Sequence, residues 1–437
     1  MALSAFVLLF VSILASMATT GSASFDLRAE LHHPYAGRPV SKYEMIREAV
    51  RASKVRRAWN AARVSKACRR GGGGGGGATS APDVPITSLG MSIYTVTVGV
   101  GTPPQQLLTL VADTGSDLVW LQCKPFRGTG DRVYDPARSS SFATIPCDGK
   151  LCREVEFDTK NCSSNRCLYT YSYGSGQAYG ELASETFTFG ARHKVPAALG
   201  FGCGRFLEGD IFNASGFLGL SPDKLSFVSQ LQIPRFSYCL SPHTDRKSGH
   251  MFFGAMADLS KYRTTGPIQT TSLLNNRIGS NIFYYVPLIS ISVGAKKLIH
   301  IPPASFYGTI VDSGYTTGGL PAVALDALKE ALVDTIKLPL RNSSDPEWDF
   351  CFQLPRGVPM TAVQTPPLLY HFEGGATMVV PRDNYLAETN PGEMCLVIGV
   401  AEQVAAVIGN YQQQNMHVLF DVQNQKFSFA PAQCDQI

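Results

Sequence analysis

The chain has 437 residues, of which 44% are hydrophobic and 16% are charged, values typical of a globular protein with room for two domains. Its 38 basic and 34 acidic residues are unevenly distributed, because residues 25–77 hold 12 basic and 4 acidic residues and leave 26 and 30 for the rest. A nucleic-acid-binding protein usually carries its positive charge on the folded body, so this distribution argues against one.

Residues 1–24 are predicted to be a secretory signal peptide. An apolar run extends from Ala5 to about Ala15, and Gly21, Ser22 and Ala23 supply small residues for cleavage. The run is shorter than the roughly 18 apolar residues of a membrane-spanning helix, and the C-terminal residues lack a lipid-anchor signal. The sequence therefore predicts a protein of the secretory pathway without a membrane anchor.

Residues 25–85 form a basic segment with a helical pattern and little that could build a core of its own. Ser41 to Glu44 has the form of a capping box, which opens a helix, and residues 71–77 are seven consecutive glycines, a flexible linker. Two interpretations stay open: a disordered basic arm, or a propeptide whose positive side chains cover an acidic site until low pH releases it. The segment also holds Cys68, whose removal leaves ten cysteines.

A first acid follows directly from a predicted strand. Residues 94–98 alternate as a strand does, residues 101–104 form a turn, and residues 107–112 return as an apolar strand. This strand ends at Asp113, followed by the residues Thr114, Gly115 and Ser116. A buried strand that delivers an acid into a glycine turn, with hydroxyls beside it, holds a carboxylate in a fixed geometry.

The same pattern recurs about two hundred residues later. Residues 309–311 are again a short strand and lead into Asp312, Ser313 and Gly314. Each acid is followed by an apolar-apolar-Gly segment, with 106 residues from Asp113 to Gly219 and 97 from Asp312 to Gly409. The repeat indicates a duplication at domain scale.

Two copies of one lobe, related by a pseudo-twofold axis, bring their equivalent turns together. Asp113 and Asp312, hereafter the acid pair, are therefore expected to face each other. Two adjacent carboxylates do not both ionise readily, so the pair holds one proton. Such a pair supplies an acid and a base in one site, which can activate a water molecule while protonating a carbonyl oxygen.

Five cysteines lie between residues 123 and 167, and an aromatic hairpin follows them. Cysteines at such spacings could bind zinc. Thiols oxidise in the secretory pathway, however, so disulfides are expected. Because the number of cysteines is odd, one of them is expected to pair outside this stretch. Residues 169–176, YTYSYGSG, alternate as a strand and break into a glycine turn, and residues 182–189 return as the second strand of a hairpin.

Together these motifs resemble the pepsin-like aspartic proteases, and within them the plant nepenthesin-type branch. The phrases at residues 201–204, 236–240, 284–288, 371–375 and 409–415 match that branch as well. The resemblance implies an all-β, bilobal fold with an active-site cleft between two pseudo-twofold-related lobes. The boundaries it suggests are a propeptide with its linker over 25–85, an N-terminal lobe over 86–266 and a C-terminal lobe over 267–437.

The resemblance also assigns roles to individual residues. Asp113 and Asp312 are the expected catalytic acids, supported by Thr114, Gly115, Ser116, Ser313 and Gly314. Tyr173 and Gly174 take the place of the family's mobile flap, and Trp120 has the spacing of a tryptophan whose indole N–H supports the flap tyrosine. Cys351 and Cys395 are the expected disulfide partners of the second lobe, and the glycosylation sequons are at Asn161, Asn213 and Asn342.

The second acid motif departs from the family pattern. The family places Thr or Ser after the second Asp-Ser-Gly, and its hydroxyl hydrogen-bonds the neighbouring carboxylate, whereas this chain has Tyr315. Gly318 likewise replaces a residue that carries a hydroxyl in the branch. A phenol is too long for the same bond, although Thr316 could substitute for it. We therefore expect weakened or narrowed activity.

The sequence predicts a secreted aspartic endopeptidase that acts at acidic pH. It is expected to need no metal or cofactor, to cleave polypeptides, to be a monomer made as a zymogen with its own propeptide as partner, and to reside in the apoplast, other extracellular fluid or the vacuole. The alternatives are a catalytically silent relative that binds a protein, as the xylanase inhibitors of this fold do, or a carbohydrate-binding β-protein. A glycosidase would need its carboxylates about 5 to 9 Å apart.

Overall fold

The computed structural model describes residues 26–37, 39–71, 93–128, 132–154, 160–173, 176–189, 193–194, 198–209, 214–245, 247–274, 282–294, 297–301, 308–341, 348–401 and 406–437. The predicted signal peptide, residues 72–77 of the glycine linker, Gly174, Asn213 and Asn342 lie outside these residues. No helix within the described ranges is both long and apolar enough to cross a membrane.

The N-terminal lobe is built from β-strands, as predicted. The expected strands at 94–98 and 107–112 are present as β2 and β3, and the aromatic hairpin is present as β7 and β8, with β9 completing the predicted return. The strands are β2 (Thr95–Val100), β3 (Gln106–Asp113), β4 (Trp120–Arg127), β5 (Ala143–Thr144), β6 (Lys160–Ser163), β7 (Arg166–Tyr173), β8 (Gly176–Glu185), β9 (Phe187–Phe189), β10 (His193–Lys194), β11 (Leu199–Gly209) and β12 (Gly216–Gly219), and the short helices are α2 (Lys150–Glu154) and α3 (Phe227–Gln230).

The C-terminal lobe contains three smaller sheets and one covering helix, α4 (Ala322–Ile336). The sheet that carries the second acid has the order β16 (Tyr285–Val286), β19 (Thr309–Val311), β28 (Val407–Ile408), β20 (Gly318–Leu320) and β27 (Ile398–Val400). The other two are β18 (Lys297–His300), β17 (Leu288–Val293), β23 (Leu368–Phe372) and β24 (Thr377–Val380), then β21 (Leu340–Arg341), β22 (Cys351–Gln353), β26 (Glu393–Leu396) and β25 (Leu386–Asn390).

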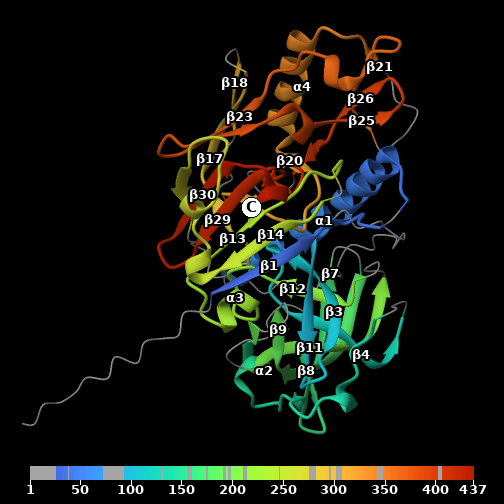
Figure 1. Ribbon diagram of the computed structural model, residues 1–437, viewed down its shortest axis with the longest axis vertical. Coiled ribbons are helices and arrows are strands. Elements are labelled where there is room, and N and C mark those ends of the chain that lie inside the picture. Colours follow the sequence, from blue (N-terminus) through green and yellow to red (C-terminus); the bar gives the residue numbers. More distant parts are fainter. Residues whose placement is uncertain are drawn as a thin grey trace, which may run out of the picture.

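Strands from both ends of the chain join the two lobes in one large sheet. It contains β1 (Leu27–His32), β13 (Arg235–Cys239), β14 (Gly249–Phe253), β15 (Gln269–Ser272), β29 (Met416–Asp421) and β30 (Lys426–Pro431). β1 lies antiparallel between β14 and β2, while β29 pairs with β13. The basic N-terminal segment thus contributes a strand to the body. The large sheet also contains the strands of the N-terminal lobe, and Figure 1 shows the two lobes one above the other with β1, β13 and β14 between them.

The sequence repeat corresponds to a structural repeat. β12 lies parallel to β3, with Gly219 opposite Asp113, and β28 lies parallel to β19 in the second lobe. A Cβ on Gly219 would lie 2.2 Å from the Asp117 carbonyl oxygen, and one on Gly409 would lie 1.7 Å from that of Thr317. Both downstream glycines are required because another backbone passes against them.

The helix of the basic segment, α1 (Lys42–Gly71), crosses between the two lobes (Figure 1). It begins as predicted, with the Ser41 hydroxyl accepting a hydrogen bond from the Glu44 backbone N–H at 3.1 Å. Its apolar residues complete cores of the body, since Ile46 packs beside Trp348 and Trp59 packs beside Phe283. The interpretation as a disordered arm is therefore wrong for this helix.

The described cysteines form five disulfides, so the zinc interpretation of the cysteine-rich stretch is wrong. Cys147 pairs with Cys162 and Cys152 with Cys167, and the odd member of the stretch, Cys123, pairs with Cys203. The other pairs are Cys239 with Cys434 and Cys351 with Cys395. Five bridges fit the oxidising environment of the secretory pathway.

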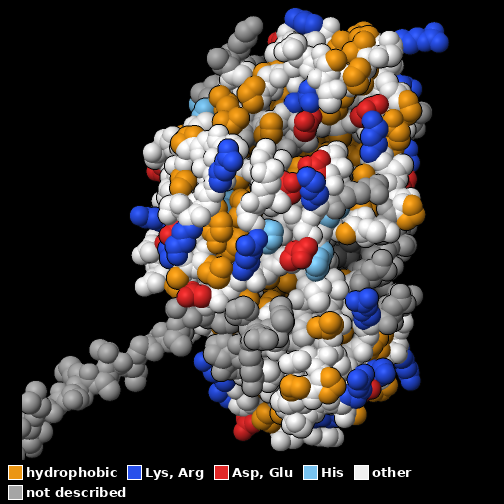
Figure 2. All heavy atoms as spheres, in the orientation of Figure 1, with side chains coloured by type: hydrophobic (Ala, Val, Ile, Leu, Met, Phe, Trp, Pro, Cys, Tyr) orange, Lys and Arg blue, Asp and Glu red, His pale blue; other side chains and the backbone are white. Residues whose placement is uncertain are grey.

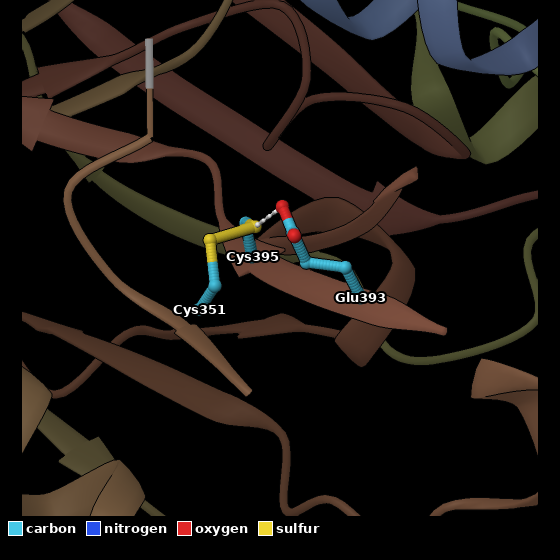
Figure 3. A group of neighbouring side chains, drawn as sticks. All are labelled: Cys351, Glu393 and Cys395. Carbon is cyan, nitrogen blue, oxygen red and sulfur yellow. Dashed lines mark hydrogen bonds between the residues drawn. A yellow bond between two sulfur atoms is a disulfide. The ribbon is translucent and has the colours of Figure 1, made fainter. Parts of the chain in front are cut away.

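One group of metal-ligand type, Cys351, Glu393 and Cys395, is drawn in Figure 3. The two sulfurs are bonded to each other at 2.07 Å and provide no thiolate. The Glu393 carboxylate forms an ion pair with Arg341 at 3.3 Å and accepts a hydrogen bond from the Thr389 hydroxyl at 2.8 Å. The donor set therefore does not fit a metal ion.

Basic and acidic side chains are interspersed over the face of the molecule shown in Figure 2. No broad patch of one sign gathers on this face, which agrees with the small negative balance of the sequence outside the basic segment. Nucleic-acid binding requires a continuous basic surface, and the described residues on this face do not form one.

The N-terminal segment before α1 meets the body at a pair of buried histidines. His33 lies edge-on to His243 with 5.6 Å between ring centroids, and Tyr94 and Tyr411 pack around the His243 ring. Burial lowers the pKa of His243 well below 6.5, and the neighbouring His33 lowers it further. A lowered pKa means that the unfolded chain binds the proton more readily, so this contribution to stability is complete above about pH 6.5 and is lost as the pH falls.

We expect acid to loosen this junction. The free energy that holds the N-terminal segment should fall by up to about 1.4 kcal/mol per pH unit below about pH 6.5, because one proton is taken up. The amide exchange of β1 measured against pH checks this expectation. His243→Phe keeps an aromatic ring without a titrating group and should flatten the dependence. An unchanged dependence in this variant would contradict it.

Candidate active site

The two acids are buried at the ends of equivalent strands. Asp113 ends β3 and Asp312 follows β19, and the side chains of both are inaccessible to solvent. The two turns clasp each other through reciprocal hydrogen bonds. The Thr114 backbone N–H donates to the Ser313 hydroxyl at 3.0 Å, and the Ser313 backbone N–H donates to the Thr114 hydroxyl at 2.9 Å. This symmetric link fixes the acid pair face to face.

Each carboxylate also accepts a hydrogen bond from its own glycine turn. The Gly115 N–H donates to Asp113 Oδ1 at 3.0 Å, and the Gly314 N–H donates to Asp312 Oδ1 at 2.8 Å. A Cβ on Gly115 would lie 2.5 Å from Asp312 Oδ1, and one on Gly314 would lie 2.2 Å from Asp113 Oδ1. The glycines are needed because the opposite acid lies against them, which shows how closely the turns approach.

The symmetry of the site breaks at the third residue after each acid. Ser116 donates its hydroxyl to Asp113 Oδ2 at 2.6 Å. The equivalent Tyr315 is buried in an apolar cluster with Ile310 and Val407, and its phenol oxygen lies beside Gly319. Thr316 does not replace the missing donor, because its buried hydroxyl has no hydrogen-bond partner among the described residues.

The acid pair is occupied by an arginine of α1. Arg56, 5% exposed, donates to both oxygens of Asp113, with Nη1 to Oδ2 at 3.0 Å and Nη2 to Oδ1 at 2.7 Å. It donates equally to Asp312, with Nε to Oδ2 at 3.1 Å and Nη2 to Oδ1 at 3.2 Å. The planar guanidinium thus bridges two carboxylates from opposite lobes.

Burial and charge oppose each other in this cluster. Burial alone would lower the pKa of Arg56, but the two carboxylates outweigh it and raise that pKa. Burial raises the pKa of Asp312 above 3.8, and Asp113 adds to the rise, while Arg56 and Asn60 act in the opposite direction. A proton that enters the site is therefore favoured on Asp312, and it removes one of the two ion pairs of Arg56.

Other residues on the same face of α1 contact the site. Ser53 accepts a hydrogen bond from the Thr317 N–H at 2.7 Å, and Asn60 donates to Asp312 Oδ2 at 3.3 Å, on the carboxylate that lacks a hydroxyl donor from its own turn. Trp59 donates its indole N–H to the Ser172 carbonyl in β7 at 2.7 Å. Arg63 pairs with Asp117 at 3.2 Å.

Sequence reasoning missed these α1 residues as members of the site. The available signal was a stripe with alternating three- and four-residue spacing, the pattern of one helix face: Ile46, Ala49, Ser53, Arg56, Asn60 and Arg63. Only the position of α1 in the folded chain shows which of its cations contacts the acid pair.

The predicted flap is described in part. Tyr173 ends β7, but its side chain, like Gly174, is outside what the structure describes. Trp120 begins β4, is fully buried and stacks on Phe217 with 5.9 Å between ring centroids. A contact between Trp120 and the flap tyrosine stays a prediction.

The comparisons with known proteins agree with this geometry. Residues 94–255 match the family described as Xylanase inhibitor N-terminal, and residues 283–431 match that described as Xylanase inhibitor C-terminal. The chain is 36% identical to aspartic proteinase nepenthesin-1 of Nepenthes gracilis over 354 residues, 78% of each protein. The chain belongs to the nepenthesin-type, pepsin-like aspartic proteases.

Further relatives extend this similarity. Aspartic proteinase nepenthesin-2 of Nepenthes gracilis is 33% identical over 422 residues, which cover 93% of this chain and 90% of the relative. Among solved structures, lupine conglutin gamma has a TM-score of 0.62 at 18% identity, over 78% of this chain and 92% of its own. The aspartic proteinase from Irpex lacteus has a TM-score of 0.55 at 20% identity, over 78% and 95%. These two likenesses show a shared pepsin-like fold.

Gly318, the other departure from the family pattern, has a packing reason. A Cβ at this position would lie 2.8 Å from Gln412 Oε1, and the same oxygen accepts a hydrogen bond from the Gly409 N–H at 3.2 Å. A larger residue would displace Gln412 and its bond to the second downstream glycine.

The missing hydroxyl beside Asp312 leads to a prediction. Tyr315→Thr places a hydroxyl where Ser116 has one, and a hydrogen bond to a carboxylate lowers its pKa. We expect the alkaline limb of the pH–rate profile, which reports loss of the proton from Asp312, to move to lower pH, at a cost of about 2 to 4 kcal/mol in stability from the lost phenol. Tyr315→Val is the matched control, with the same shape as threonine and no hydroxyl. Identical pH profiles for the two variants would contradict the prediction.

Proposed function

We propose that the protein is a secreted aspartic endopeptidase, made as a zymogen, that cleaves polypeptides at acidic pH with Asp113 and Asp312. The observation that carries the proposal is the bridging of both buried carboxylates by one guanidinium group. It requires two acids aimed at one point, which is the geometry that water activation needs. Family membership supports the substrate class.

The proposed reaction uses one proton shared by the acid pair. Burial raises the pKa of Asp312, which also lacks a hydroxyl donor like the one that Ser116 gives to Asp113, so we place the proton on Asp312. The ionised carboxylate takes a proton from water as the water oxygen attacks the carbonyl carbon, and the protonated acid donates to the carbonyl oxygen. Collapse of the tetrahedral intermediate breaks the C–N bond and gives a proton to the leaving amine. The protein forms no covalent intermediate.

The zymogen proposal concerns the basic segment. The Arg56 guanidinium fills the position where the attacking water has to be, and α1 covers the site from Lys42 to Arg63. We infer that residues 25–85 are the inhibitory propeptide and that acid releases them. Because protonation of either acid removes an ion pair of Arg56, a fall in pH weakens this contact between α1 and the site. Protonation of His243 loosens β1 in the same direction.

Secretion follows from the predicted signal peptide together with the disulfides. The apoplast, other extracellular fluid and the vacuole are the compartments we propose, with glycosylation at Asn161, Asn213 and Asn342. Asn161 lies exposed on β6, where an oligosaccharide can be accommodated. We further propose that the enzyme acts as a monomer.

The test is hydrolysis of denatured haemoglobin by the acid-treated protein, with identification of the cleaved bonds. We expect endoproteolysis at acidic pH that pepstatin blocks. Failure of a folded, processed protein to cleave any protein substrate would favour the second candidate, a protein-binding member of the family. The observation that favours this candidate is the loss at Tyr315 of the hydroxyl donor to Asp312.

A further inference from the structure

A second buried ion pair between α1 and the body lies beside the acid pair. Arg63 donates Nη2 to Asp117 Oδ1 at 3.2 Å and Nη1 to the Tyr171 hydroxyl at 2.9 Å. Asp117 is fully buried and Arg63 is 8% exposed. Nothing in the hydrolytic mechanism uses Asp117, although it lies only four residues beyond the catalytic Asp113.

The residues of the body that surround Arg63 are suited to binding a cation. Tyr171 and Phe283 have their ring centroids 5.9 and 5.8 Å from the Arg63 guanidinium carbon. Aromatic faces at this distance attract positive charge. The Tyr171 hydroxyl also donates to Asp117 Oδ1. A carboxylate beside two aromatic rings remains in the body when α1 leaves.

Asp117 has capacity for another donor. Its Oδ2 atom is buried and has no hydrogen-bond partner among the described residues. A buried carboxylate oxygen is costly to leave unpaired. Asp223 supplies further negative charge near Arg63, since it is among the groups that raise the pKa of Arg63 against the lowering by burial. A ligand with several N–H donors would satisfy this site better than water or an apolar side chain.

The separation from the acid pair matches a peptide substrate. Arg56 and Arg63 are seven residues apart on the helix, about 10 Å at 1.5 Å per residue. An extended peptide covers the same distance in about three residues at about 3.3 Å per residue. Because Arg56 marks the position of the scissile bond, Arg63 marks a substrate side chain two or three residues away.

We propose that Asp117, with Tyr171 and Phe283, forms a subsite that selects a lysine or arginine side chain two or three residues from the scissile bond, and that Arg63 occupies this subsite before activation. The proposal rests on the function proposed above. It makes Asp117 a specificity-determining residue, which acts on substrate binding and not on the water.

The test uses the processed protein and peptides that differ at one position. Each position up to three residues on either side of the scissile bond is occupied in turn by lysine, acetyl-lysine or norleucine, which share their aliphatic stem and differ in charge. We expect one position at which lysine raises kcat/KM about 10-fold to 100-fold over norleucine, the range of a hydrogen-bonded charge pair. Asp117→Asn should bring this ratio close to one. Equal values at all positions for the native protein would overturn the proposal.

A binding measurement separates this proposal from the proposed activity. The same peptides with a reduced, uncleavable scissile bond are titrated into the processed native protein, from which a separate protease has removed the basic segment, by calorimetry. Tighter binding of the lysine peptide in a protein that hydrolyses nothing would support the subsite and contradict the endopeptidase. Equal binding of the lysine and norleucine peptides would overturn the subsite whatever the activity. These native-protein measurements decide the question even if Asp117→Asn does not fold.

Discussion

Arg56→Gln is expected to release the acid pair on acidification without the lag that we expect for the native protein, in which α1 has to leave the site first. The substitution removes both ion pairs and the bridging fork, while the remaining contacts of α1 are retained. Breaking a buried ion pair by removing one partner costs about 3 to 5 kcal/mol. The affinity of α1 for the site should therefore fall by about two to four orders of magnitude.

The measurement is the time course of peptide hydrolysis after a jump to acidic pH, together with retention of the full-length protein on immobilised pepstatin at higher pH. The variant should hydrolyse the peptide at once. It should also be retained on immobilised pepstatin at a pH at which the native protein is not retained. Loss of Arg56 also removes a cause that lowers the pKa of Asp312, so that pKa should rise further.

Two matched substitutions separate geometry from charge. Arg56→Lys keeps the positive charge without the planar fork and should give a shortened lag. Arg57→Gln removes a neighbouring arginine that donates to the Val400 carbonyl at 3.2 Å, and it should keep the native lag. A native lag in Arg56→Gln would show that the bridge does not control access to the acids.

Asp113→Asn is expected to abolish hydrolysis while the fold persists. The amide cannot accept a proton from water, and loss of a positioned general base lowers kcat by at least about 100-fold to 10,000-fold. Asn has the shape of Asp, so the hydrogen bond from the Gly115 N–H can be retained, while the amide nitrogen can donate to the Ser116 hydroxyl. We expect Asp312→Asn to have a comparable effect, because the pair works with a single shared proton.

The measurement is kcat on a peptide substrate after processing in trans by a separate protease, so that failed self-processing is not mistaken for failed catalysis. Amide exchange of β3 and β19 checks that both strands keep their native protection. Ser140→Ala is the control variant, because Ser140 is exposed and its hydrogen bonds go to the Thr102 hydroxyl. This control should keep the native kcat. Activity that persists in Asp113→Asn would identify a contaminating protease.

Much of the fold was predictable because its signals are local. The alternation at residues 94–98 and the apolar run at residues 107–112 each involve only a few neighbouring residues. Each of these patterns predicted a strand that is present in the structure. The repeated Asp-hydroxyl-Gly motif also predicted that two acids meet, because duplicated lobes place equivalent turns on one axis. The capping box at Ser41 predicted the start of α1, since its hydrogen bond spans only three residues.

The sequence did not predict in the same way that Arg56 occupies the acid pair. Arg56 is one of twelve basic residues in its segment. It lies on the helix stripe described above, but nothing within the helix shows whether Arg56 or Arg63 contacts the acid pair. The difference arises from the position of the helix, which is set by the packing of Ile46 and Trp59 against the body. The orientation of the Tyr315 side chain was equally unpredictable, because it depends on the apolar cluster into which the ring packs.

Strand patterns and turn motifs are encoded by neighbouring residues, and they were enough to identify the family, the two-lobed β architecture and the acid pair. Three features could be known only from the folded chain: which arginine bridges the acids, how the cysteines pair outside the second lobe, and that Asp117 faces a cation. These features depend on contacts between residues tens to hundreds of positions apart, whose geometry is fixed by the packing of the whole chain.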